Sequence, residues 1–349
     1  MKTSYDPGDV ILLLKDITGL VQPEDTKQRE RAIQSGRHYS EMLPVEYSPS
    51  EKYMEAYRAA LANFSTATAQ AVALLSEKIM SARGPCVVLV SLARAGTPVG
   101  ILLKRYLRKK YGIEVPHYSI SIIRGRGIDK NAMRFLLERY PAKDLLFVDG
   151  WIGKGAILRE LQSEIASYEG VRGELAVLAD PANLTPLCGT HEDILIPSSC
   201  LNSTVSGLIS RTFLREDIIG KEDFHGALYY GELRKFDLSY DFIRAIEREF
   251  PLEIPENKKA PSSKGIEEVL RIAADFGIED INLIKPGIGE STRVLLRRVP
   301  DCILIAEKAA QEPSLFHILQ LAKEKDVPVR TYPLRNYKAC GIIRKLTDL

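Results

Sequence analysis

Residues 145–156 read LLFVDGWIGKGA, and this stretch decides the fold. The apolar run at 145–148 predicts a short buried strand, and the glycine-rich turn after Asp149 opens a helix over residues 156–168. A turn of this kind directs backbone N–H groups and a helix N-terminus at one place, where an anion is stabilised. Lys154 adds a positive charge there, and Asp149 is placed to bind sugar hydroxyl groups. The alternative is a tight strand–helix turn without a ligand.

The same strand–turn–helix unit recurs on both sides of this stretch. Strands are expected at residues 86–90, 115–123 and 175–178, and helices at 48–81, 98–111 and 130–140. Strands that alternate with helices predict an α/β fold with a parallel sheet and right-handed crossovers. Ligands bind outside the carboxyl ends of such strands, so we expect the loops after Val90, Ile123, Val148 and Leu178 to share one cleft.

A second domain is expected after residue 265. Residues 251–265 read PLEIPENKKAPSSKG, which has no apolar period and predicts a linker. Helices and strands alternate again over residues 266–349, a length that suits a small domain. The predicted organisation is therefore a first domain at 1–250, a linker at 251–265 and a second domain at 266–349.

Composition limits the classes of protein. The chain of 349 residues has 45% hydrophobic and 27% charged residues and a net charge of +2, which argues against coating DNA by bulk electrostatics. Its five cysteines (Cys86, Cys188, Cys200, Cys302, Cys340) contain no C-x-x-C pair, so neither a zinc nor a redox motif is indicated. The apolar run at 10–14 is too short for a signal peptide or a membrane span. We expect a cytoplasmic protein.

Further candidate site residues follow the other strands or precede the long helix. Residues 91–98 read SLARAGTP, and the guanidinium of Arg94 suits bidentate binding of a phosphate. Residues 124–127 read RGRG, which suits either a loop that closes over phosphates or a solvated turn. Upstream, His38, Tyr39 and Glu41 form a compact cluster that suits recognition of a heterocycle or acid/base chemistry; the alternative is a packed Tyr and a hydrogen-bonded His.

These blocks resemble the type I phosphoribosyltransferases. In that comparison Asp149 matches the first acidic residue of the loop that binds the diphosphate sugar PRPP, while Gly150 stands where a second acid is expected. The resemblance implies a parallel sheet with flanking helices, displacement of pyrophosphate from PRPP, and Mg²⁺ carried by PRPP. It also implies that Arg94 binds pyrophosphate, that Arg124 and Arg126 lie on a flexible loop, and that His38, Tyr39 and Glu41 belong to a hood over the base. The implied phosphate-binding residues are Ala93, Ala95, Gly96, Gly150, Gly153, Lys154, Gly155 and Ala156.

Five ordered blocks together resemble one bacterial family linked to tellurium-resistance (Ter) stress operons. They are GRHYSEMLP, SLARAGTPVG, HYSISIIRGRGID, FVDGWIGKGA and IPSSCLNSTVSGLISRT. That family is described as predicted phosphoribosyltransferases, carries the older label cysteine protease StiP, and often has a C-terminal Pelota-type RNA-binding domain. The resemblance implies a stress-response phosphoribosyltransferase that transfers or releases ribose 5-phosphate.

Residues 289–299, 302–308 and 327–329 resemble the small α/β/α Pelota/L7Ae-like fold, in which a glycine-rich basic turn contacts RNA. The matching positions are Lys285, Gly287, Gly289, Glu290, Ser291, Thr292 and Arg293. The alternative is an oligomerisation or scaffold module. The expected partners are a nucleotide or PRPP-like molecule, structured RNA and a second copy of the chain, and no membrane.

Two other functions stay open. The absent second acid at Gly150 favours a non-catalytic nucleotide- or RNA-binding regulator. A cysteine protease would need Cys200 to meet His38, His191 or His225, although isolated cysteines are more often small buried residues. The histidines His117, His191, His225 and His317 show no metal-ligand spacing.

Overall fold

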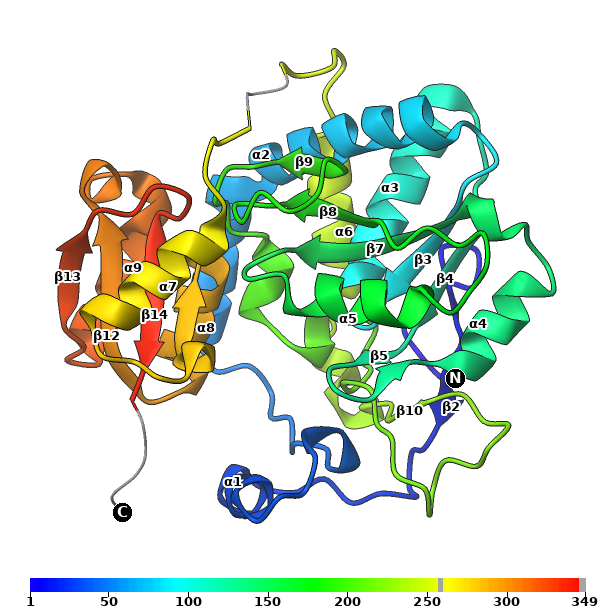
Figure 1. Cartoon of the computed structure of the whole chain (residues 1–349), viewed down its shortest axis with the longest axis horizontal. Coiled ribbons are helices and arrows are strands. Elements are labelled where there is room, and N and C mark those ends of the chain that lie inside the picture. Colours follow the sequence, from blue (N-terminus) through cyan, green and yellow to red (C-terminus); the bar gives the residue numbers. More distant parts are fainter. Residues whose placement is uncertain (257–259, 345–349) are drawn as a thin grey trace.

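A computed structural model describes residues 1–256 and 260–344. Its first part is built on a six-stranded parallel sheet in the order β1-β4-β3-β7-β8-β9 (Figure 1). The strands are β1 (Ile11–Leu12), β3 (Val88–Leu92), β4 (His117–Ile120), β7 (Leu145–Trp151), β8 (Leu175–Ala179) and β9 (Cys188–Thr190). Every neighbouring pair is parallel. The predicted α/β fold with a parallel sheet is confirmed, whereas its phosphoribosyltransferase type is not.

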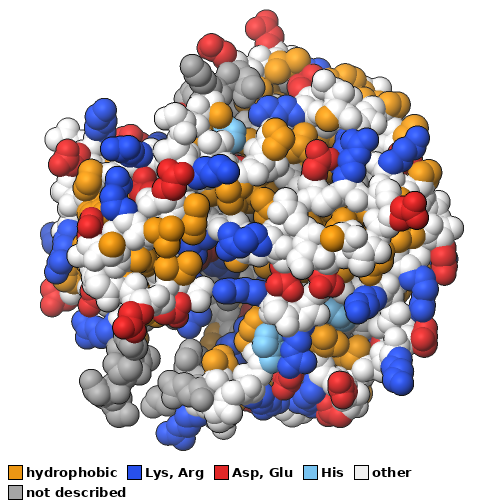
Figure 2. Space-filling view, viewed as in Figure 1, with side chains coloured by type: hydrophobic (Ala, Val, Ile, Leu, Met, Phe, Trp, Pro, Cys, Tyr) orange, Lys and Arg blue, Asp and Glu red, His pale blue; other side chains and the backbone are white. Residues whose placement is uncertain are grey.

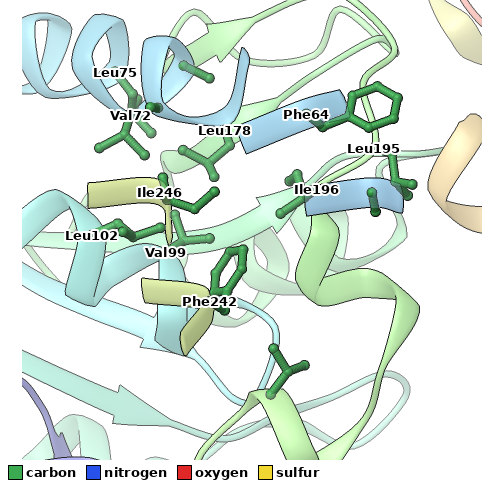
Figure 3. Packing of buried hydrophobic residues seen from close by; sticks show 14 of the residues in the cluster. Phe64, Val72, Leu75, Val99, Leu102, Leu178, Leu195, Ile196, Phe242 and Ile246 are labelled. Atoms are coloured by element: carbon green, nitrogen blue, oxygen red, sulfur yellow. The ribbon is translucent and has the colours of Figure 1, made fainter. Parts of the chain in front are cut away.

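Helices cover both faces of this sheet, which explains why every residue of β3, β4 and β8 is buried. One face carries α2 (Glu51–Arg83), α3 (Gly96–Tyr111) and α6 (Ser239–Arg248). Figure 3 shows side chains of these three helices meeting Leu178 of β8. The other face carries α4 (Lys130–Leu137) and α5 (Ala156–Ile165).

The remaining elements of the first part lie below the sheet in Figure 1. Helix α1 (Thr26–Gln34) begins at a capping box formed by Asp25 and Gln28. Two small sheets complete this region, one formed by β2 (Lys15–Asp16) with β10 (Gly226–Ala227), the other by β5 (Ile122–Ile123) with β6 (Gly127–Ile128).

A second sheet forms the C-terminal domain, the name used here for residues 265–344. Its order is β11-β14-β12-β13, with β14 antiparallel to both of its neighbours. The strands are β11 (Ile284–Pro286), β12 (Pro300–Ala306), β13 (Val329–Tyr332) and β14 (Ala339–Ile343), and the helices are α7 (Gly265–Asp275), α8 (Ile288–Arg297) and α9 (Phe316–Glu324). Strand β14, which pairs with both β11 and β12, was not predicted.

The C-terminal domain packs firmly on the first part. Leu295 of α8 and Ile318 of α9 belong to the same apolar cluster as α2 and the first sheet. Tyr53 of α2 donates a hydrogen bond to the carbonyl oxygen of Leu296 at 2.7 Å. The two sheets therefore share a core, and the division at residues 251–265 stays a prediction. Within the described residues no helix combines the length and apolarity needed to cross a membrane.

Candidate functional site: a basic cleft between the two sheets

A cavity of about 440 Å³ lies where the β7–α5 loop faces the β11–α8 segment of the C-terminal domain. Five cationic side chains line it together with two carboxylates, those of Asp149 and Glu290. The cations are Arg124, Lys154, Arg159, Lys285 and Arg293. Figure 2 shows Lys and Arg side chains gathered around the hollow between the C-terminal domain and the rest of the chain. The cleft thus carries an excess of positive charge.

Lys154 reaches across the cleft from the β7–α5 loop. Its ammonium donates hydrogen bonds to the carbonyl oxygens of Ile281 at 2.5 Å and Ile284 at 2.9 Å. Burial, reinforced by the nearby ammonium of Lys285, lowers the pKa of Lys154 to about 8. This lysine therefore joins the two sheets and keeps a third N–H for another acceptor.

Lys285 lies on β11, opposite Lys154. Burial also lowers the pKa of Lys285; the carboxylate of Glu290 opposes this shift, and the cations Arg298, Arg124 and Arg293 reinforce it. Within residues 1–256 and 260–344, its ammonium forms no ion pair. An anion in the cleft would therefore relieve repulsion between cations that the fold already holds together.

Arg293 of α8 links the cleft to the end of β7. Its guanidinium carbon lies 5.6 Å from the centre of the Trp151 ring, and one of its nitrogens lies 3.4 Å from Glu290. Such a planar cation can both stack on an aromatic ring and donate to phosphate oxygens. Arg293 and Trp151 therefore offer a polar and an aromatic surface at one position.

Asp149 lies at the carboxyl end of β7, as predicted. One carboxylate oxygen accepts a hydrogen bond from the N–H of Gly150 at 2.7 Å. Burial raises the pKa of Asp149 to about 7, while the Gly150 N–H and Arg293 act in the opposite direction. This acid can hold or release a proton near neutral pH.

The N-terminus of α5 faces the same cleft. Ala156, Ile157 and Leu158 of its first turn line the cavity, and no side chain caps the helix. Gly155 adopts φ +75, and a Cβ there would lie 2.5 Å from Leu184, so only glycine fits this turn. Gly153 and Lys154 line the same cavity, and their binding of phosphate stays a prediction. A helix N-terminus without a side-chain cap can stabilise an anion.

The loop after β3 departs from the prediction for Arg94. Its guanidinium donates to the carbonyl oxygen of Ile209 at 2.7 Å and to Glu46 at 2.9 Å, and Arg94 is not among the residues that line the cleft. Ala95 does line the cleft. Gly96 packs against β7, since a Cβ there would lie 2.3 Å from the carbonyl oxygen of Val148. Arg94 is thus engaged in a largely buried ion pair rather than directed at a ligand.

The structure brings the predicted hood and the predicted loop together. The hydroxyl of Tyr39 accepts a hydrogen bond from the N–H of Arg124 at 2.9 Å, and Arg126 pairs with Glu41 at 2.6 Å. His38 contacts the hydroxyl of Ser40 at 2.8 Å. Only Arg124 of this group lines the cleft, where it also donates to Asn282 at 3.1 Å.

The glycine turn before α8 is not open to RNA as predicted. The N–H of Gly287 donates to the carbonyl oxygen of Ala339 at 2.8 Å, and the N–H of Ile288 donates to the carboxylate of Asp193 at 3.0 Å. Thr292 is buried and contacts His317 at 2.8 Å, so its hydroxyl faces the interior. Gly289, also near this turn, lies close to Ser199. Of the predicted RNA-binding positions, Lys285, Glu290 and Arg293 line the cleft.

The cysteines are arranged differently from the pairing considered above. Cys200 is buried in the 3₁₀ turn Pro197–Cys200, whereas His191 lies beside Cys188, with Sγ and Nε2 3.3 Å apart. Asp180 completes this group, which the sequence analysis missed. The spacing Cys188-x-x-His191 was the available signal.

Comparisons with known proteins name two families. Residues 3–247 match a family model described as "Tellurite-like stress resistance cysteine protease StiP". Residues 263–345 match one described as "PELOTA RNA binding domain". A curated protein of Acinetobacter baylyi, "Cysteine protease StiP", is 35% identical over 364 residues, which cover 98% of this chain and 94% of that protein.

Solved structures give a weaker likeness. A xanthine-guanine-hypoxanthine phosphoribosyltransferase of Helicobacter pylori shares 19% identity at a TM-score of 0.24, covering 32% of this chain and 70% of that chain. A hypoxanthine-guanine phosphoribosyltransferase of Bacillus anthracis shares 15% identity at a TM-score of 0.25, covering 41% and 75%. TM-scores this low support no conclusion about fold or activity.

These findings correct the functional prediction. The assignment as a phosphoribosyltransferase, a glycosyltransferase that uses PRPP, is wrong. The family model and the curated relative are both named as a cysteine protease. The expected Pelota domain and the link to tellurite-type stress agree with the matches. Residues 263–345 match the Pelota model, and the chain as a whole belongs to the StiP family of tellurite-like stress resistance proteins.

Proposed function

We propose that this chain binds RNA and that one nucleotide of that RNA, with its phosphate, lies in the cleft between the two sheets. The observation that carries the proposal is the set of five cations around the N-terminus of α5, three from the first part and two from the matched Pelota domain. RNA affinity is dominated by contacts between phosphates and Lys or Arg side chains.

The size of the cleft supports a single nucleotide rather than a duplex. A cavity of about 440 Å³ lies within the range of small-molecule sites. Proteins that recognise RNA by sequence usually bind unpaired nucleotides, whose bases are free to stack on aromatic rings or Arg side chains. Trp151 and Arg293 line the cleft and offer both surfaces.

The experiment is a fluorescence-anisotropy titration of the full chain with a labelled kink-turn RNA and with a straight RNA duplex. Lys285→Glu should weaken binding to the kink-turn RNA by at least about 10-fold, because a repelling charge replaces a phosphate contact. The matched control is Lys325→Glu, an exposed lysine of the same domain outside the cleft, which should change affinity by less than about 2-fold. Equal effects of the two variants, or no binding by the wild type at low salt, would overturn the proposal.

A competition experiment locates the nucleotide. Unlabelled nucleoside 5′-monophosphates should displace the labelled RNA from the wild type. The Lys285→Glu substitution should lower the affinity for the nucleotides as well as for the RNA. Measuring the titrations with and without Mg²⁺ also tests the predicted cation, which was expected with PRPP. The predicted homo-oligomer stays a prediction.

Because the relatives are named as cysteine proteases, the cysteines of this chain have to be considered as possible nucleophiles. A nucleophilic cysteine must form a thiolate and reach its substrate. Cys188, Cys200, Cys302 and Cys340 are buried, and burial raises the pKa of Cys188 to about 11. Cys86 is exposed but lies before the amino end of β3, whereas the cleft lies at the carboxyl end of the neighbouring strand β7. The geometry therefore supports binding in the cleft better than proteolysis at a described cysteine.

A further inference from the structure

Three side chains with metal-binding atoms meet beside strands β8 and β9, outside the cleft. Asp180 follows β8, Cys188 begins β9, and His191 follows β9. One ligand atom of each lies within 4.8 Å of the other two. The Sγ of Cys188 is 3.3 Å from the Nε2 of His191. This group has no part in the proposed RNA site.

The imidazole of His191 is held in one tautomer. Its Nδ1 lies 2.9 Å from the backbone carbonyl oxygen of Asp180. A carbonyl oxygen can only accept, so Nδ1 carries the proton and Nε2 keeps its lone pair, which lies near Cys188. Metal-binding histidines are commonly oriented in this way, by donating their other N–H to a backbone carbonyl or a carboxylate.

Asp180 supplies an independent observation. Its side chain is fully buried, and Oδ2 accepts hydrogen bonds from the N–H groups of Leu184 at 2.6 Å and Thr185 at 2.8 Å. The other oxygen, Oδ1, is buried and has no hydrogen-bond partner within the described part of the chain. A buried carboxylate oxygen without a partner is costly, and a cation would satisfy it.

We propose that Cys188 Sγ, His191 Nε2 and a carboxylate oxygen of Asp180 bind a divalent transition-metal ion of the zinc class. A thiolate, an imidazole and a carboxylate are the donors that Zn²⁺ takes in proteins, and the thiolate disfavours Mg²⁺ and Ca²⁺. Tetrahedral Zn–S and Zn–N bonds of about 2.3 and 2.1 Å separate S and N by roughly 3.6 Å, close to the separation present without a metal. His191 is partly exposed, which gives an ion a way in.

The ion would stabilise the loop on which the C-terminal domain docks. Ala182 of this loop accepts a hydrogen bond from the N–H of Gly265 at 3.0 Å, and Pro181 accepts one from the side chain of Asn336 at 2.9 Å. A ligand that binds only the folded chain raises its melting temperature. The site is therefore structural, and its occupancy should appear in thermal stability.

The test is a Co²⁺ titration of the full, metal-stripped chain, followed by displacement with Zn²⁺. One equivalent of Co²⁺ should give a thiolate-to-metal charge-transfer band and tetrahedral d–d bands, and both should vanish when Zn²⁺ is added. Cys188→Ser should lose the charge-transfer band. His191→Gln, at a partly exposed position that tolerates change, should weaken Co²⁺ binding by more than the roughly 10–100-fold typical of a lost outer-shell partner.

Cys302→Ser is the matched control, because Cys302 is also a buried cysteine on a strand but belongs to the second sheet. It should keep the band, and Zn²⁺ should raise the melting temperature of this variant and the wild type but not that of Cys188→Ser. Absence of the band in the wild type, its persistence in Cys188→Ser, or full-affinity Co²⁺ binding by His191→Gln would overturn the proposal.

Discussion

The carboxylate of Asp193 accepts a hydrogen bond from the N–H of Ile288 at 3.0 Å, so an acid of the first part caps helix α8 of the C-terminal domain. The same carboxylate accepts a second hydrogen bond from the N–H of Lys338 at 2.8 Å. An anion therefore already occupies the N-terminus of α8, whereas the N-terminus of α5 has no side-chain cap. A bound phosphate is therefore expected at the N-terminus of α5, which has no side-chain cap, rather than at that of α8.

Asp193→Asn should loosen the docking of the C-terminal domain. Oδ2 accepts from Ile288 at 3.1 Å and from Lys338 at 2.8 Å, and Oδ1 accepts from Ile288 at 3.0 Å. The NH₂ group of Asn must therefore face at least one buried N–H, at a cost of about 1–3 kcal/mol. Denaturant unfolding should show this loss, and limited proteolysis should cut residues 251–265 faster. Asp301→Asn, an exposed position in the same domain, should change neither.

The stability of the chain should depend on the protonation of Asp193. Burial raises the pKa of Asp193 from 3.8 to about 6, so the folded state holds this proton more tightly than the unfolded state. This contribution is complete below about pH 4 and is lost as the pH rises through 6, and it amounts to at most about 3 kcal/mol. Unfolding of wild type and Asp193→Asn at several pH values measures it. Parallel pH profiles for the two proteins would contradict the assignment.

Phosphate binding should weaken above pH 8 because of Lys154. Burial and the Lys285 ammonium lower the pKa of Lys154 to about 8, so its positive charge is lost as the pH rises through that value. Lys154→Arg keeps its charge in this range, so its RNA affinity should fall less steeply with pH than that of the wild type, although Asp149 titrates in both proteins. Anisotropy titrations from pH 7 to 9 compare the two proteins. The idea fails if both lose affinity in parallel.

Gly96→Ala should destabilise the first sheet. The added Cβ would lie 2.3 Å from the carbonyl oxygen of Val148, which is backbone and cannot rotate away. Overpacking of this kind costs about 1–3 kcal/mol of the free energy of unfolding. The matched control is Gly150→Ala, because a Cβ there would meet no atom closer than 3.8 Å, and its loss of stability should be smaller. Gly84→Ala would not serve, because Gly84 has φ +71, which strains any other residue. Equal losses in the two variants would show that the contact at Gly96 relaxes.

The local pattern of apolar residues and glycines predicted strand β7 and helix α5, which form one side of the cleft. The apolar run before Asp149 and the glycines after it correspond to β7 and the loop before α5, because a buried parallel strand and a tight turn both leave a strong sequence signal. Strand β14 was missed because a short run containing Gly341 follows an irregular loop. Whether Lys154 and Lys285 would face each other depends on how the two parts dock, and no local pattern contains that information.

Residues that act through distant contacts were the hardest to predict. Arg94 had the right residue type and loop, but its ion pair with Glu46 joins residues 48 positions apart. Asp193 gave no local signal, since its partners come from 95 and 145 positions away. The Cys188–His191 spacing was visible, but its significance depends on Asp180 and on the backbone carbonyl that orients the imidazole.

The most direct test asks whether Lys154 and Lys285 hold the same phosphate. It is a double-mutant cycle on RNA affinity with Lys154→Met, Lys285→Met and the double variant. The account predicts that each single change weakens binding, and that their effects are non-additive by at least about 0.5 kcal/mol, as for residues that share a partner. Strictly additive effects, or RNA affinity unchanged by both single variants, would contradict a phosphate held between the two sheets.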